Sequence, residues 1–245
     1  MYSHVYFVDG LLIDTGHSRK RRQVFETTKK LPVDQMFVTH HHEDHTGNIL
    51  AIQKQFGCDV FASEHCCELM KDPPKLSLAQ KLFWGDRPAY PNLISISDTI
   101  ETKNHRFKII PIKGHAEDMV ALYEAERKWL FSADLYVTSR TGYFLKNESM
   151  LAQIESMRKI LALEFDAMFC SHNPKLENAK QNLQEKLDNF EEFFDNVSRL
   201  HHKGHSSKEI FKMLDLKEQK LIKWLSFGQL SRLNMVESVI RDIHK

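Results

Sequence analysis

Four histidines and two acidic residues occupy six consecutive positions, His40 to His45, within the segment THHHEDHTGN. The whole chain of 245 residues holds 14 histidines, so chance placement is a poor explanation for this cluster. Solvated charge runs are built from lysine and glutamate, whereas imidazole and carboxylate groups together are ligands of borderline divalent cations. The cluster therefore predicts a metal site.

The cluster has the spacing H-x-H-x-D-H, in which His40, His42, Asp44 and His45 are the candidate ligands. Alternate residues of an extended segment point the same way, so His40 and His42 can bind one cation. Asp44 and His45 then lie beside them and can serve a second cation. The same alternation turns His41 to the opposite side, and we exclude it from the site.

Two catalytic cations need more protein ligands than this cluster supplies. Three further candidates each follow an apolar strand pattern: His115 in PIKGHAED, Asp134 in LFSADLY and His172 in MFCSHNP. Strand ends are where α/β folds place their ligands, so we expect these side chains to meet the cluster.

The elements that must position these residues alternate between strand and helix in the first part of the chain. The segment VYFVDGLLIDTG predicts two strands joined by a hairpin at Asp9-Gly10. A basic helical stretch, the strand QMFVTH, a helix over residues 47–57 and the strand CDVFAS follow. This alternation predicts an α/β domain, and the histidine cluster begins where one of its strands ends.

The second part of the chain contains a run of strands followed by helices. The segments LISIS, HRFKIIPI, MVALYEAE and KWLFSAD predict antiparallel strands with hairpin turns. SMLAQIESMRKILAL predicts an amphipathic helix and FDAMFCSH a last strand, after which the strand patterns stop. We therefore expect a metal-binding domain over residues 1–174 and a C-terminal helical extension over residues 175–245.

Residues 71–92 interrupt the regular patterns with four prolines and several aromatic residues. A loop of this length is usually functional or mobile. Phe83, Trp84 and Tyr90 are apolar for a free loop, so they either line a substrate groove or plug the edge of the core.

Composition excludes some classes of partner. Lys and Arg number 34 against 33 acidic residues, a net charge of +1 that indicates no polyanion partner. Residues 201–245 hold nine basic against five acidic residues, which supports nucleic-acid binding only weakly. No stretch approaches 18 apolar residues and no leader pattern follows Met1, so we expect a cytoplasmic protein without a membrane span. The adjacent Cys66 and Cys67 are predicted as buried thiols, and the remaining histidines as surface residues, with His17 the one that could contribute to function.

The H-x-H-x-D-H motif, the later G-H and F-S-x-D, and the last strand-end histidine resemble the metallo-β-lactamase superfamily in that order, from Val5 to Pro174. The resemblance implies a four-layer αββα sandwich with the metals at one edge between the two sheets. It also implies two groups of metal ligands, His40, His42 and His115 for one cation and Asp44, His45 and His172 for the other. Asp134 would bridge the two cations, and Asp14 would support the ligand loop without binding metal. Met119 departs from the pattern of several subfamilies, which carry a histidine there.

Two bridged cations would share a water, lower its pKa and polarise a carbonyl, with Asp44 orienting that water or accepting its proton. This chemistry predicts a hydrolase of an ester, thioester or lactone bond in a small molecule, with a glyoxalase-II-like branch as one candidate. Zinc is the first candidate metal, with manganese or iron as alternatives. A phosphodiesterase or nuclease of the same fold, an iron-dependent oxidoreductase and a non-catalytic scaffold are the other classes. The helical extension could also support a homodimer.

Overall fold

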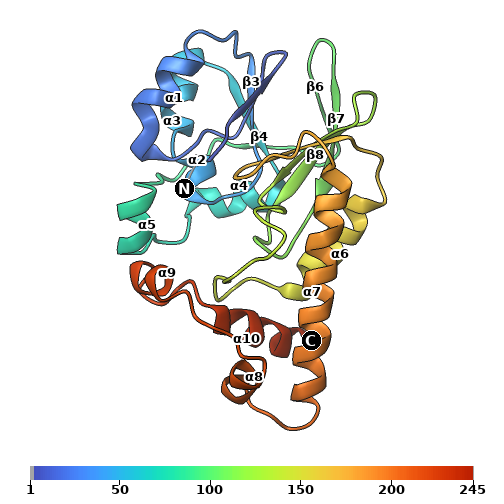
Figure 1. Cartoon of the computed structure of the whole chain (residues 1–245). Helices are drawn as coiled ribbons and strands as arrows, with labels where there is room; N and C mark the ends of the chain where they lie inside the picture. The colour runs from blue at the N-terminus through green and yellow to red at the C-terminus, as the bar shows by residue number, and fades with distance from the viewer. Residues whose placement is uncertain (1–2, 245) are drawn as a thin grey trace.

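Two five-stranded sheets face one another, with helices on their outer faces (Figure 1). The computed structural model describes residues 3–244. The strand order is β1-β2-β3-β4-β5 in the first sheet and β10-β9-β8-β7-β6 in the second. The architecture confirms the α/β class predicted from the strand and helix patterns and is the four-layer sandwich that the family resemblance implied.

The first sheet combines one hairpin with parallel strands. Its members are β1 (Tyr6–Val8), β2 (Leu11–Ile13), β3 (Gln35–Val38), β4 (Asp59–Ala62) and β5 (Ile94–Ser95). The first two pair antiparallel, and the others continue in parallel register. Asp9 and Gly10 join the hairpin with φ of 48° and 88°, the left-handed conformation that the predicted two-residue turn requires.

Alternate side chains of the first sheet enter two different cores. Leu12, Met36 and Val38 pack in the core that the outer helices cover. Leu11 and Phe37 point the other way, into the core between the sheets. Because both faces of these strands are buried, each strand is apolar at successive positions rather than at alternate ones. The covering helices are α1 (Arg21–Thr28), α3 (Ile49–Phe56) and α4 (Glu64–Lys71) (Figure 1), and the short helix η1 (Ser18–Lys20) directly precedes α1.

The second sheet is antiparallel except for its last strand. Its members are β6 (Thr99–Glu101), β7 (Arg106–Pro111), β8 (Val120–Glu124), β9 (Trp129–Ala133) and β10 (Ala167–Cys170), of which β10 runs parallel to β9. The prediction that LISIS begins this antiparallel run was wrong. Its residues Ile94 and Ser95 form β5, which pairs in parallel with β4 of the other sheet. A short apolar run does not specify its partner strand, so only the tertiary structure separates the two sheets.

The outer face of the second sheet is covered by α6 (Met150–Leu161) and α7 (Ala179–His201) (Figure 1). Below the sheet, α10 (Arg232–Ile243) packs against α6 and α7, and α8 (Ser207–Met213) packs against α7 and α10. One core joins Ile110 and Met168 of the sheet with Leu183, Phe190 and other residues of these helices. Helices after residue 174 thus belong to the same core as the sheet. The division into a metal-binding domain over residues 1–174 and a helical extension over residues 175–245 stays a prediction.

Two short helices lie near the predicted ligands. The second half of the cluster lies in α2 (Glu43–Thr46), and its first three histidines lie in the loop between β3 and this helix. Residues 71–92, expected as a loop, contain α5 (Leu78–Phe83), which begins with a capping box between Ser77 and Gln80. The structure places the three aromatic residues of this segment differently. Tyr90 is buried in the core between the first sheet and its outer helices, and Phe83 is 46% exposed. Trp84 lies beside the predicted ligand His172. Within residues 3–244, no helix has the length and apolar character needed to span a membrane.

Candidate metal centre

The seven predicted ligands converge at the carboxyl ends of strands from both sheets. They form two groups, His40, His42 and His115 in the first, and Asp44, His45, Asp134 and His172 in the second. Within each group the possible ligand atoms all lie within 4.8 Å of one another. This geometry is compatible with one cation in each group.

Asp134 belongs to the second group and also contacts the first. Its Oδ2 is 3.4 Å from Nε2 of His115 and 3.3 Å from Nε2 of His172, while its Oδ1 is 3.4 Å from Nε2 of His45. The preceding residue, Ala133, has a φ of 45°, a left-handed conformation that costs a non-glycine residue about 1–2 kcal/mol. This turn ends β9 and brings the Asp134 carboxylate into contact with both groups.

Buried atoms at the centre lack partners at hydrogen-bonding geometry. This holds for Nε2 of His40, Nε2 of His45 and Oδ1 of Asp134, although all three atoms are buried. Burying such groups without partners is costly, and most buried polar atoms in proteins are paired. Imidazole nitrogens and a carboxylate oxygen are also the donors that zinc, manganese and iron accept. The residues therefore fit bound divalent cations.

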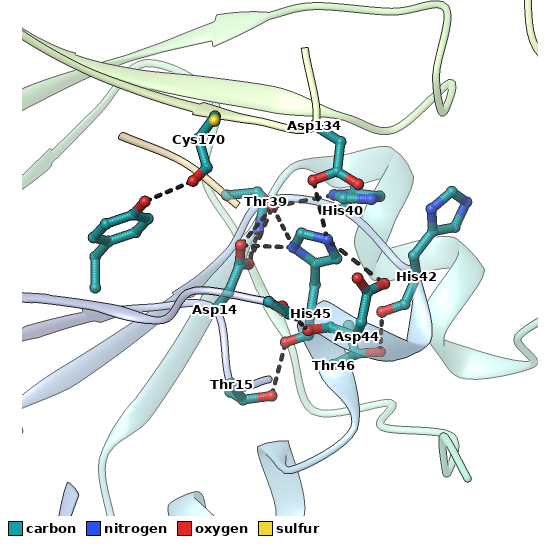
Figure 2. Close-up of polar contacts among 12 residues, drawn as sticks. Asp14, Thr15, Thr39, His40, His42, Asp44, His45, Thr46, Asp134 and Cys170 are labelled. Atoms are coloured by element: carbon teal, nitrogen blue, oxygen red, sulfur yellow. Dashed lines mark hydrogen bonds and ion pairs between the residues drawn. The ribbon is translucent and has the colours of Figure 1, made fainter. Parts of the chain in front are cut away.

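Asp14 holds the ligand loop in place (Figure 2). Its Oδ1 accepts a hydrogen bond of 2.9 Å from the backbone N–H of Thr39, and its Oδ2 accepts one of 2.9 Å from the Thr39 hydroxyl. The same Oδ2 lies 2.8 Å from Nδ1 of His45. An acidic partner at Nδ1 orients the ring and leaves Nε2 for the site, which is the arrangement around most metal-bound histidines.

Burial and charge set the protonation of the ligands. Burial lowers the pKa of His40 and His42 well below its usual value, which leaves both rings neutral. Burial acts in the same direction on His45, but three neighbouring carboxylates, Asp44 first, outweigh it and raise its pKa well above the usual value. For Asp134, two neighbouring imidazoles outweigh burial and hold its pKa well below the usual range. The centre therefore offers the neutral rings of His40 and His42 beside the ionised Asp134 carboxylate.

Glu148 is a neighbour of the site that the sequence did not reveal. Its Oε2 is 3.3 Å from Nδ1 of His115 and accepts a hydrogen bond of 2.9 Å from Gln153. Burial lowers the pKa of His115, but Glu148 outweighs it and the pKa is raised. Glu148 precedes α6 in a segment without any pattern, so no local signal connects it with a histidine 33 positions earlier.

His41 lies outside both groups, as the alternation predicted. Its backbone N–H donates to Oδ2 of Asp118 over 2.7 Å, and its Nδ1 is 2.8 Å from Oδ1 of the same residue. The Arg87 guanidinium donates to the carbonyl of His41 over 2.9 Å. Asp118 and Arg87, both buried and both missed in the sequence, thereby tie the ligand loop to the segment that precedes β8 and to the segment that carries α5.

Trp84 forms one wall of the site. Its ring centroid is 5.2 Å from that of His17 and 6.4 Å from that of His172. The expectation that His17 is a surface residue was wrong, because this histidine is only 9% exposed. The sequence placed both residues near function, but only the fold brings residues 17 and 84 together.

Cys66 and Cys67 are buried free thiols, as predicted, and neither belongs to the two ligand groups. Burial raises the pKa of both thiols. They act as packing residues of α4.

Comparison with known families matches residues 1–172 to the metallo-β-lactamase superfamily. The chain belongs to this superfamily. The match covers more than two thirds of the 245 residues and includes all seven predicted ligands.

Among curated proteins, this superfamily member is similar to two bacterial hydroxyacylglutathione hydrolases. The protein of Hydrogenovibrio crunogenus is 28% identical over 197 residues, which cover 77% of this chain and 65% of that protein. The protein of Buchnera aphidicola is 29% identical over 170 residues, with 67% and 57% covered. The chain thus spans about half to two thirds of the length of these and other hydroxyacylglutathione hydrolases that it matches, and 71% of some others.

Among solved structures, the chain resembles a metallo-β-lactamase family protein from Thermus thermophilus. The TM-score is 0.69 at 16% identity, and the alignment covers 98% of this chain and 88% of that one. At this identity the likeness establishes the fold. It extends through the C-terminal helices, since it covers nearly the whole chain.

Proposed function

We propose that this superfamily member is a metal-dependent hydrolase that cleaves an ester, thioester or lactone bond in a small molecule. The observation that carries the proposal is the pair of adjacent ligand groups that share Asp134. A thioester is the first candidate substrate, because the curated relatives named above are hydroxyacylglutathione hydrolases. Their identity of 28–29% supports the class of reaction rather than a particular substrate.

The proposed metal site consists of two divalent cations, with zinc as the first candidate. His40, His42 and His115 would hold one, Asp44, His45 and His172 the other, and Asp134 would contact both. When bound, such a pair supplies a water of lowered pKa as nucleophile and polarises the carbonyl under attack.

Asp44 is the candidate catalytic residue. Its Oδ2 lies 3.5 Å from Nε2 of His172 and its Oδ1 3.7 Å from Nε2 of His45, so its carboxylate faces the second group. The side chain can orient the attacking water and accept its proton. Trp84, beside His172, would contact the acyl part of the substrate and exclude bulk water.

Hydrolysis of three substrates by the purified chain tests the proposal: a thioester, a lactone and bis-p-nitrophenyl phosphate. We expect the thioester or the lactone to be cleaved fastest, and chelation of the metal to abolish the activity. Faster cleavage of the phosphodiester would favour the phosphodiesterase alternative. A metal-loaded chain that cleaves neither acyl substrate would refute the proposal.

Substitution of Asp44 tests its role within the same assay. Asp44→Asn should lower kcat by roughly 10²–10⁴-fold, the usual contribution of a general acid or base. Asp59→Asn is the matched control, because Asp59 is an exposed aspartate at the start of β4. Equal activities of the two variants would remove Asp44 from the mechanism.

A further inference from the structure

Helix α7 presents a row of polar side chains to the segment that follows Asp134. Asn182, Lys186 and Asn189 are spaced by four and three residues, so they lie on one face of the helix. The Lys186 ammonium donates to the carbonyl of Leu135 over 2.6 Å. The Asn189 amide donates to the carbonyl of residue 139 over 3.2 Å, and Asn182 accepts from the hydroxyl of residue 136 over 3.2 Å. The row therefore fastens residues 135–139 to α7.

The segment begins with the turn that aims Asp134. Ala133 is left-handed, and the backbone N–H of Leu135 returns to the carbonyl of Ser132 over 3.0 Å. The parallel register between β9 and β10 also shifts at this point. A non-glycine residue keeps such a conformation only where its surroundings enforce it. The Leu135 carbonyl, two residues after Ala133, is held by Lys186.

Lys186 is an unusual residue for a helix that packs on a sheet. It is 2% exposed, its ammonium is 4.9 Å from the centre of the Phe190 ring, and Glu148 and Asp134 are near enough to favour its charge. Burial lowers its pKa to about 8. Lysines are almost never fully buried, and a leucine or methionine would fill this place without the cost of desolvating a charge. Packing alone does not account for it.

We propose that Lys186 is a positioning residue for the metal centre. Through the Leu135 carbonyl it holds the turn that directs Asp134 toward both ligand groups, so α7 is part of the scaffold of the site. The inference rests on the proposed metal-binding function, in which Asp134 contacts both cations. It also gives a role to the packing of α7 in the same core as the sheet that carries Asp134. Figure 1 shows α7 beside α6 on that side of the sheet.

Titration of the metal-free full-length chain with Co²⁺ tests the proposal, since the visible spectrum of Co²⁺ reports its coordination. Lys186→Met keeps the length of the side chain and removes its charge and donors. We expect its Co²⁺ affinity to fall about 10–100-fold, the usual effect of losing a residue that orients a metal ligand, and the spectrum to change. Lys180→Met, on the exposed side of the same helix and paired with Glu164, should leave both unchanged.

A second control separates positioning from general loss of stability. Leu187→Ala removes buried apolar contacts from the same helix, so it should lower the melting temperature and leave Co²⁺ affinity unchanged. If Lys186→Met does not fold, Asn182→Leu carries the test, with a smaller loss of affinity expected. Wild-type Co²⁺ affinity in the folded Lys186 variant, or an equal loss in Leu187→Ala, would overturn the proposal. A metal-loaded wild type without hydrolytic activity would contradict the proposed function but not the positioning role.

Discussion

Removal of the Asp14 carboxylate should damage the ligand loop even in the absence of metal. Asp14 is 3% exposed and accepts hydrogen bonds from the backbone N–H and the hydroxyl of Thr39, besides its contact with Nδ1 of His45. Asp14→Ala leaves these three polar groups buried without that acceptor. At about 1–2 kcal/mol for each group left unsatisfied, the free energy of unfolding should fall by about 3–6 kcal/mol. Alanine also tolerates the φ of 62° at this position poorly.

Asp14→Asn separates the loss of charge from the loss of shape. Asparagine adopts the left-handed conformation readily and can still accept the bonds from Thr39. Its amide group would turn toward Nδ1 of His45, which favours the ring tautomer with the proton on Nε2, the atom that faces the site. We therefore expect a small loss of stability but a roughly 10–100-fold loss of metal affinity.

Urea denaturation of the metal-free variants measures the first effect, and Co²⁺ titration the second. Asp59→Ala, in an exposed position of the same sheet, is the control for removing a carboxylate and should change the free energy of unfolding by less than about 0.5 kcal/mol. A loss below about 1 kcal/mol for Asp14→Ala would refute the reasoning about its buried partners. Unchanged metal affinity in Asp14→Asn would refute the tautomer argument.

Three further outcomes follow from the site. Asp134→Ala should lower the metal content from about two ions per chain toward one or none and abolish hydrolysis. Mass spectrometry of chelator-free preparations measures the metal content, and two ions in an inactive variant would contradict the bridging role. Trp84→Ala should raise KM clearly while changing the melting temperature little. A lowered melting temperature with little change in KM would make this residue part of the core. Burial lowers the pKa of Lys186 from 10.5 to about 8, so the folded chain binds fewer protons than the unfolded chain between these values. The free energy of unfolding of the metal-free wild type, compared with that of Lys186→Met, should therefore rise between about pH 8 and 10.5, by up to about 3 kcal/mol. Urea denaturation measures this difference, and a difference that does not change with pH would contradict the buried charge.

The sequence alone was sufficient to identify the candidate ligands. His40, His42, Asp44 and His45 are close in the chain, so their spacing predicts their proximity before any tertiary contact is known. The other candidates each follow an apolar run, and strands of an α/β fold end at a common edge. Alternation also separated His41 from the ligands, because successive side chains of an extended segment point to opposite sides.

The partners that hold the candidate ligands and their loop depended on the tertiary structure. Glu148 meets His115, Asp118 meets His41, and Lys186 meets the carbonyl after Asp134 across 33, 77 and 51 positions of the chain. Each of these is a single charged residue without a repeating pattern, so the sequence contains no local signal for its contact.

The assignment of strands to sheets was decided in the same way. Local periodicity predicts that residues 93–97 are extended, but a two-residue strand such as β5 pairs with whichever edge the surrounding chain presents to it. The burial of His17 has the same cause, since it depends on a contact with Trp84, which follows α5 far along the chain. Hydrophobic spacing specifies which face of an element is buried, whereas long-range packing specifies what that face meets.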